Sequence, residues 1–253
     1  MSKMPMLFVG HGSPMNAISN NEFSKTWKGL MDSYEKPKAI LAVSAHWYTD
    51  RTYIQKTEEP RQIYDMYGFP DELYELKYTP KGERKLSKRV LELMEESTVN
   101  NDWGIDHGSW SVLCHIYPKA DIPVVQLSID GKLSLADHYE LGKKLAPLRE
   151  EGVLILGSGN ILHNLRRVEW EREGMTDIGK EFDDRVHDAI LERNFTKVLE
   201  LEGTEGFKYA APTPDHFIPL LYVLPNISEE DTIEVFNRGG HMGSLSMTSY
   251  LIK

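Results

Sequence analysis

Four continuous apolar runs, rich in β-branched residues, stand out along the 253-residue chain. They are residues 6–10 (MLFVG), 39–45 (AILAVSA), 122–129 (IPVVQLSI) and 153–159 (VLILGSG). A continuous apolar run of this length is typical of a strand that is buried on both faces of a parallel sheet. We therefore expect these four runs to form the central strands of the fold.

Helical periodicity occupies the segments between these runs. Apolar residues recur at three- and four-residue intervals within residues 21–34, 84–96, 134–148 and 178–201. Ser134 stands where the N-cap of the third of these helices is expected. Strands that alternate with helices predict an α/β fold, with a mostly parallel central sheet flanked by helices on both faces.

Three further segments complete the expected organisation. Residues 233–236 and 244–252 alternate between apolar and polar positions, which is typical of edge or antiparallel strands. Residues 50–80 contain three prolines and several tyrosines, and we interpret them as a long irregular excursion that can serve as a lid. Because no linker rich in glycine, serine or proline divides the chain, we expect one domain over residues 1–253.

Composition and charge limit the functional classes to which this protein can belong. The formal net charge is -10, with 39 acidic and 29 basic residues, which argues against a nucleic-acid surface. The single cysteine, Cys114, excludes an intrachain disulfide and fits a reducing compartment. The first apolar run is too short for a signal peptide, and no apolar stretch approaches the ~20 residues that span a bilayer. We expect a cytoplasmic protein without a membrane or nucleic-acid partner.

Three histidines follow apolar runs: His11, His46 and, less closely, His163. Ligands of α/β sheets bind beyond the carboxyl ends of the strands, and imidazole is the commonest protein ligand of transition metals. Gly10 and Gly12 let the backbone turn sharply around His11. A single histidine of this kind is often only a buried, hydrogen-bonded residue, but the repetition favours a metal site at the carboxyl edge of the strands.

Two more histidines stand beside aspartates. His216 lies in PTPDHFIPLLY, where prolines stiffen the approach and Asp215 precedes the imidazole. Here Asp215 can also be the N-cap of a helix. His107 follows Asp106 in DHGSW, where a nearby carboxylate would orient an imidazole and raise its basicity. An ordinary polar turn is the alternative interpretation for this motif.

The segment GSGNILHNL at residues 157–165 fails the dinucleotide fingerprint because Leu162 occupies the third glycine position. We interpret Gly157 and Gly159 as room for the chain to pass close to a bound group, and we place His163 on the first turn of a helix, as a ligand or a general acid/base. His241, in a glycine-rich turn, is a weaker candidate. The motifs G-x-S-x-G and H-E-x-x-H are absent, and one cysteine excludes a zinc finger.

The motifs GHGSP, SAHW, DHGSW, GSGNILHNL and PTPDHFIPLLYVL, taken together, resemble the DOPA extradiol dioxygenase family. This family belongs to the class III (LigB-type) extradiol ring-cleavage superfamily. Each motif alone is weak, but the five occur in the family's order and at family-like spacing. The resemblance extends from Met4 to GSLSMTSY near the C-terminus and implies an α/β domain with a metal site on one edge.

The resemblance also implies roles for five histidines. His11 and His46 match the two metal-binding histidines, and His216 matches the last metal position, where the wider superfamily has a glutamate. His163 matches the acid/base histidine, which can also be a fourth ligand, and His107 matches one that hydrogen-bonds substrate or oxygen. The implied cofactor is one divalent metal ion: Fe(II) for dioxygenase activity, with Zn(II) plausible in the isolated protein because an all-histidine site suits both metals.

The implied partners are a small aromatic diol and O2, and the implied reaction is extradiol cleavage of a catechol such as DOPA. In this reaction His163 would take a proton from the substrate, and His107 would stabilise the developing anion. For the walls around a flat ring we name Trp47, Tyr48, Trp110 and Phe217, although core packing explains these aromatics equally well. A zinc-dependent hydrolase and a non-catalytic metal-binding module on the same fold remain alternatives.

Overall fold

The four apolar runs form the four central strands of the sheet in the computed structural model, which describes residues 3–253. These strands are β1 (Met6–Gly10), β2 (Ala39–Thr49), β5 (Val124–Asp130) and β6 (Val153–Gly159). Nearly all of their residues are buried, as continuous apolar runs require. They lie side by side in the order β5-β2-β6-β1 and run parallel, so their carboxyl ends meet at one edge.

Outside this parallel centre the sheet is mixed. The full order is β4-β3-β5-β2-β6-β1-β10-β7. On one side β10 (Ser249–Ile252) is antiparallel to β1 and to β7 (Ile233–Phe236), which confirms antiparallel strands in the C-terminal region. On the other side the short β3 (Tyr53–Ile54) is antiparallel to β5, and β4 (Thr98–Val99) is parallel to β3. The prediction of a mostly parallel sheet thus holds for its centre only.

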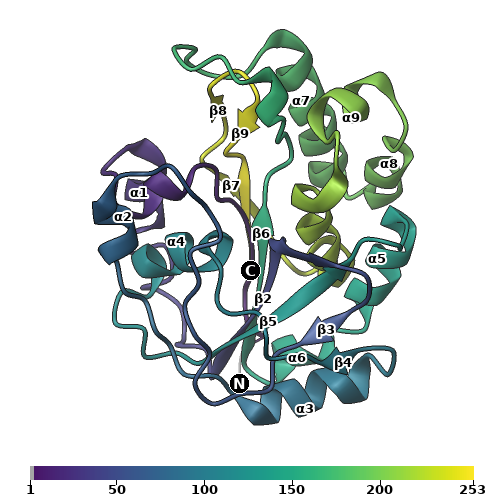
Figure 1. Ribbon diagram of the computed structural model, residues 1–253. Helices are drawn as coiled ribbons and strands as arrows, with labels where there is room; N and C mark the ends of the chain where they lie inside the picture. The colour runs from purple at the N-terminus through teal and green to yellow at the C-terminus, as the bar shows by residue number, and fades with distance from the viewer. Residues whose placement is uncertain (1–2) are drawn as a thin grey trace.

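Helices cover both faces of the sheet (Figure 1). Alternate residues of each central strand enter two separate hydrophobic cores, as the period of a strand dictates. One core lies under α3 (Arg84–Leu93), α5 (Leu135–Lys143), α6 (Pro147–Glu150), α7 (Asp177–Leu191), α8 (Phe195–Glu200) and α9 (Glu205–Ala210). The other lies under α1 (Glu22–Trp27), α2 (Asp71–Glu75) and α4 (His107–Ile116). The result is a single α/β domain; residues 1 and 2 of the expected range lie outside the described part.

The helices are shorter than periodicity predicts, and the backbone shows why. After α1, Gly29 adopts a φ of 75°, in the left-handed region that ends a helix. Arg193 has a φ of 56° and separates α7 from α8 within the range that the sequence analysis treats as one helix. The third expected helix is divided into α5 and α6 ahead of Pro147, which takes the first position of α6.

The remaining segments are short 3-10 helices and one small hairpin. The 3-10 helices are η1 (Pro14–Ala17), η2 (Leu165–Arg167), η3 (Pro214–His216), η4 (Ile218–Tyr222) and η5 (Leu224–Asn226). The hairpin pairs β8 (Gly240–His241) with β9 (Leu245–Ser246). The excursion over residues 50–80 is irregular except for β3 and α2. Among the described residues, no helix combines the length and the apolar character that a membrane crossing requires.

A buried ion pair connects α6 with the segment that precedes β7. Arg149 of α6 binds both carboxylate oxygens of Asp231, at 2.7 and 2.9 Å, and both side chains are buried. The same guanidinium donates to the carbonyl oxygens of Met4 (2.9 Å) and Asn226 (2.8 Å). Burial alone would raise the pKa of Asp231, but the hydrogen bonds from Arg149 and the Ser228 backbone outweigh it, and the pKa lies below its usual range.

We predict that Asp231→Asn lowers the free energy of unfolding by about 3–5 kcal/mol at pH 7, because Arg149 is left as an unpaired buried cation. Urea titrations measure this change. Asp121→Asn is the control: its exposed pair with Lys36 is worth less than ~1 kcal/mol. Since the folded pKa of Asp231 is depressed, its contribution is complete above the unfolded pKa near 3.9 and is lost as pH falls toward the folded value. Equal losses in the two variants would refute the role of the buried pair.

Candidate functional site

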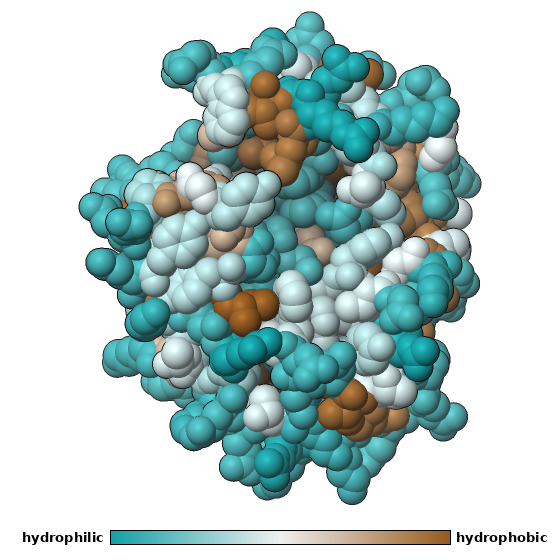
Figure 2. Space-filling view, viewed as in Figure 1, coloured by the Kyte–Doolittle hydropathy of each residue, from teal (hydrophilic) through white to brown (hydrophobic). Residues whose placement is uncertain are grey.

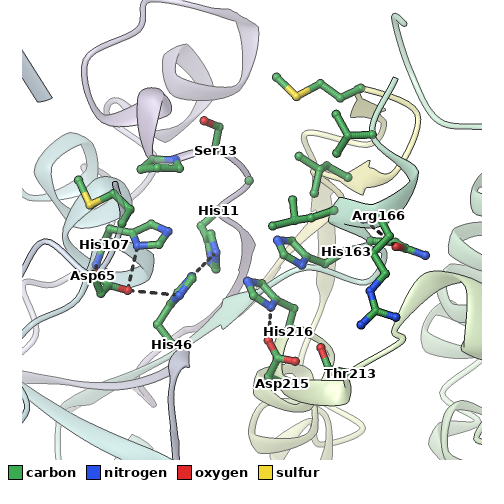
Figure 3. A pocket seen from close by; sticks show the side chains of 18 of the residues that line it. His11, Ser13, His46, Asp65, His107, His163, Arg166, Thr213, Asp215 and His216 are labelled. Atoms are coloured by element: carbon green, nitrogen blue, oxygen red, sulfur yellow. Dashed lines mark hydrogen bonds and ion pairs between the residues drawn. The ribbon is translucent and has the colours of Figure 1, made fainter. Parts of the chain in front are cut away.

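Five histidines from five distant segments line one cavity of about 810 Å³ at the carboxyl edge of the parallel strands (Figure 3). His11 directly follows β1, and His107 is the first residue of α4. His46 lies within β2, because the strand continues to Thr49 through an irregularity in its pairing with β5. His163 follows β6, and His216 ends η3. Figure 2 shows the hollow in this face, with hydrophobic residues along its upper edge.

Two expectations about local structure are corrected here. His163 is not on a helix: it forms an isolated antiparallel bridge with Leu245, and the short η2 begins only at Leu165. The glycine positions of β6 leave room for the chain itself and not for a bound group. A Cβ on Gly159 would collide with the carbonyl oxygen of His216, which accepts a hydrogen bond from Asn160 N–H at 2.8 Å. The absence of a side chain at Gly159 therefore lets η3 approach the strand ends.

The proton of His11 is fixed by a hydrogen-bond chain. Its Nδ1 lies 3.0 Å from Ser158 Oγ, and this hydroxyl donates to the carbonyl oxygen of Gly108 at 2.5 Å. A hydroxyl has one proton, so Ser158 Oγ must accept from His11 Nδ1–H. The other ring nitrogen of His11, Nε2, then carries a lone pair.

Carboxylates fix three more imidazoles in the same way. Asp65 Oδ2 lies 3.3 Å from His46 Nδ1 and 3.0 Å from His107 Nδ1, and Asp65 Oδ1 accepts from the backbone N–H of His107 at 2.8 Å. Asp215 Oδ2 lies 2.5 Å from His216 Nδ1. An ionised carboxylate can only accept, so each of these Nδ1 atoms holds its proton and each Nε2 is left with a lone pair in the neutral ring.

Three of these Nε2 lone pairs lack a protein donor. His11 Nε2 and His46 Nε2 lie 3.1 Å apart and face each other, and His216 Nε2 is buried without a hydrogen-bond partner among the described residues. Ring nitrogens of the three residues lie within 4.8 Å of one another. Because unpaired buried acceptors are costly, this arrangement fits a bound cation. The hydrogen-bonded Nδ1 atoms are the outer partners that metal-binding histidines usually have.

The electrostatics favour the neutral form of three of the cavity histidines, His11, His46 and His163. Burial, and then the neighbouring histidines, hold the pKa of His11 and of His46 well below the usual value. Burial also lowers the pKa of His163. For Asp65 and Asp215, burial raises the pKa, but the hydrogen bonds from His107 and His216 outweigh it, so both pKa values lie below the usual range. Neutral His11 and His46 thus lie beside ionised carboxylates, which is the state that binds a metal.

The two aspartates that precede His107 and His216 have different roles. The Asp106 side chain makes no hydrogen bond to the His107 ring: it caps α4 and accepts from Ser44 Oγ and Gln126 Nε2, both at 2.7 Å. The carboxylate that orients His107 is Asp65, which the sequence analysis missed because it lies in the irregular excursion. Asp215 makes no cap for η3, and its partner is His216.

His163 occupies a position of its own in the cavity wall. Its ring stacks on the ring of His216, with centroids 3.5 Å apart and planes 2° from parallel. Its backbone N–H donates to the carbonyl oxygen of Ala210 at 2.8 Å. His241 lies elsewhere: it contacts the ring of Phe23 and is not part of the cavity wall.

The structure does not bring the four aromatic residues named for substrate contact to the cavity. Trp47 stacks on Tyr53, and Tyr48 lies beside Gly131 at the surface. The other two are buried: Trp110 Nε1 donates to the carbonyl oxygen of Ile63 at 2.9 Å, and Phe217 packs against Phe182 and Phe207 in the core. The apolar walls are instead Met66, Tyr67, Phe69, Leu165, Val168, Trp170, Met242 and Leu245.

We predict that Asp65→Asn weakens divalent-metal binding about 10- to 100-fold, because loss of this carboxylate releases the orientation and tautomer of His46. Titration of the metal-free protein with Zn(II) against a competing chelator measures the affinity. Asp71→Asn, an exposed substitution in the same excursion, is the control and should bind normally. An affinity of Asp65→Asn equal to that of the control would contradict this role of Asp65.

Residues 5–250 match the family model described as the catalytic LigB subunit of aromatic ring-opening dioxygenase. A relative from Escherichia coli K12 named 4,5-DOPA dioxygenase extradiol is 41% identical, with 99% of this chain and 95% of the relative covered. A relative of the same name from Beta vulgaris is 38% identical, with coverage of 96% and 94%. The crystal structure of an uncharacterised Escherichia coli K12 protein aligns with a TM-score of 0.85 and 38% identity, covering 99% of this chain and all of that one.

Proposed function

The chain belongs to the LigB family of aromatic ring-opening dioxygenases and is an extradiol ring-cleavage dioxygenase, and we propose that His11, His46 and His216 hold its metal ion through Nε2. The observation that carries this proposal is the convergence of three lone pairs whose Nδ1 protons are held elsewhere. The sequence analysis kept two alternatives, a zinc-dependent hydrolase and a non-catalytic metal-binding module. Membership of this family favours the dioxygenase over both.

The native metal in this proposal is Fe(II). When bound, the metal would supply Lewis acidity toward a catechol and, as iron, the electron-transfer chemistry that O2 requires. Zinc has no redox chemistry, so zinc in the same site would give an inactive protein. The three neutral imidazoles suit either metal, and the two carboxylates beside them, Asp65 and Asp215, partly balance its charge from the outer layer.

His163 is the proposed general base. Its lowered pKa keeps the imidazole neutral at neutral pH, and its ring lies in the cavity wall against His216. A catechol hydroxyl close to the three-histidine cluster therefore has a proton acceptor beside it. General base catalysis of this kind contributes about 10²- to 10⁴-fold to a rate.

His107 is the proposed stabiliser of negative charge. The Nδ1–H of His107 is hydrogen-bonded to Asp65, so the ring atom left to form a hydrogen bond with substrate or oxygen is Nε2. A protonated Nε2 donates a hydrogen bond, and the Asp65 carboxylate stabilises the resulting imidazolium. The ring of His107 lies with its centroid 3.9 Å from that of His46, next to the proposed metal ligands.

The substrate in this proposal is a catechol of the DOPA type. The relatives from Escherichia coli and Beta vulgaris carry DOPA in their names. The apolar cavity walls suit a flat ring and exclude water from it, while polar groups are concentrated at the histidine end. O2 is the second substrate.

We predict O2 uptake with L-DOPA after anaerobic reconstitution with Fe(II), and none with Zn(II). His11→Ala should abolish uptake together with stoichiometric metal binding. His163→Ala should keep the metal but lower kcat about 10²- to 10⁴-fold. His187→Ala, on α7 outside the cavity, is the control and should retain full activity.

Separate outcomes would count against each part of this proposal. Full activity of His163→Ala with L-DOPA would remove His163 from proton transfer. Tight metal binding by His11→Ala would remove His11 from the ligand set. Uptake by the zinc-loaded protein, with iron excluded by elemental analysis, would overturn the assignment of iron.

A further inference from the structure

One cationic side chain in the cavity wall has no role in the chemistry described so far. Arg166 of η2 is the one lysine or arginine among the cavity-lining residues within 3–253. In this described range, its only hydrogen bond comes from its backbone N–H, which donates to Asn164 Oδ1 at 3.1 Å. Arg172 and Arg238, by contrast, are paired with carboxylates: Arg172 with Glu169 at 3.1 Å, and Arg238 with Asp183 at 2.7 Å.

The position of Arg166 relates it to the substrate and not to the metal. Arg166 follows His163 by three residues, in the segment after β6. The same segment therefore positions both the proposed base and this guanidinium. Figure 3 shows the side chain extending toward Thr213, on the opposite side of the cavity from Asp65 and His107. A ring whose hydroxyls face the histidine cluster can therefore direct its substituent toward Arg166.

Arg166 is the one protein cation that the described cavity wall offers to an acidic substrate. Apart from Arg166, the ionised groups of the wall are the carboxylates of Asp65 and Asp215, whose pKa values lie below the usual range. The chain as a whole has a formal net charge of -10. With the catechol hydroxyls at the histidine cluster, a carboxylate on the substrate's side chain would find its protein cation in Arg166. The guanidinium plane can bind a carboxylate through two parallel hydrogen bonds.

We propose that Arg166 binds the carboxylate of the catechol's side chain and so selects acidic, amino-acid-type catechols over uncharged or cationic ones. The inference rests on the proposed function because it places the catechol hydroxyls at the histidine cluster. Arg166 is in this account a specificity residue: it fixes the far end of the substrate and takes no part in proton transfer.

The test compares three catechols that differ in their side chains: L-DOPA, dopamine, which lacks the carboxylate, and 3,4-dihydroxyphenylpropionate, which lacks the amine. For Arg166→Gln we expect the ratio of kcat/KM for L-DOPA to that for dopamine to fall about 10- to 150-fold, as expected for loss of hydrogen bonds to a charged group. The loss should appear mainly in KM, and 3,4-dihydroxyphenylpropionate should follow L-DOPA. Arg166→Glu should reverse the preference in favour of dopamine.

Arg167→Gln is the matched control, since Arg167 is the next residue of η2 and does not line the cavity. It should leave the ratio unchanged. An equal loss for all three catechols in Arg166→Gln, or an unchanged ratio, would overturn the proposal.

Calorimetry separates this inference from the proposed function. The anaerobic, metal-loaded wild type should bind L-DOPA more tightly than dopamine, and Arg166→Gln should remove the difference, even if no catechol is cleaved. Absence of O2 uptake by the wild type would contradict the proposed function alone. Equal affinities of the wild type for L-DOPA and dopamine would contradict the role of Arg166 alone.

Discussion

The proposed metal site depends on which atoms hold the Nδ1 protons of three histidines. Ser158 and Asp215 accept from Nδ1 of His11 and His216, and Asp65 Oδ2 lies 3.3 Å from Nδ1 of His46. With these protons fixed, the lone pairs of three Nε2 atoms converge on one point, where the protein supplies no donor for them. Binding of a divalent cation stabilises a set of neutral imidazoles whose lone pairs face one another in this way. The proposed metal site therefore depends on these three acceptor residues as much as on the three proposed ligands.

The fold explains how these groups meet. Two of the proposed ligands come from the carboxyl edge of the parallel strands, at the end of β1 and within β2, where polar groups of an α/β fold normally gather. The third comes from η3, which reaches the edge because Gly159 has no side chain to obstruct it. The acceptor Asp65 comes from the irregular excursion before α2. One carboxylate in that segment orients both His46 and His107, so a loop without regular structure positions two functional groups.

Much of this arrangement could be predicted from the sequence, and the exceptions have physical causes. Continuous apolar runs are informative about central strands because burial on both faces leaves no polar alternation. Histidines that follow such runs must lie near the same edge. By contrast, an aspartate in an irregular segment, such as Asp65, carries no periodicity that would give its direction. An aromatic residue such as Phe217 is equally compatible with a cavity wall and with a core, and here it is in the core.

Adjacency in the sequence does not identify the carboxylate that orients His107. Asp106 precedes His107, yet it caps α4 and faces a buried network, while Asp65, 42 residues away, provides the carboxylate. Helix lengths were overestimated where the backbone enters the left-handed region, as at Arg193, because an arginine gives no sign of a positive φ. These errors affect partners and boundaries, and they leave the set of five cavity histidines intact.

The most direct test of the central claim is anomalous diffraction from crystals of the metal-loaded protein. We predict one peak within about 2.0–2.2 Å of the Nε2 atoms of His11, His46 and His216, with Asp65 still hydrogen-bonded to His107 and paired with His46. The main competitor is the second cluster of potential ligands, His46, Asp65 and His107. A peak centred there, with Asp65 as a direct ligand, would contradict the account.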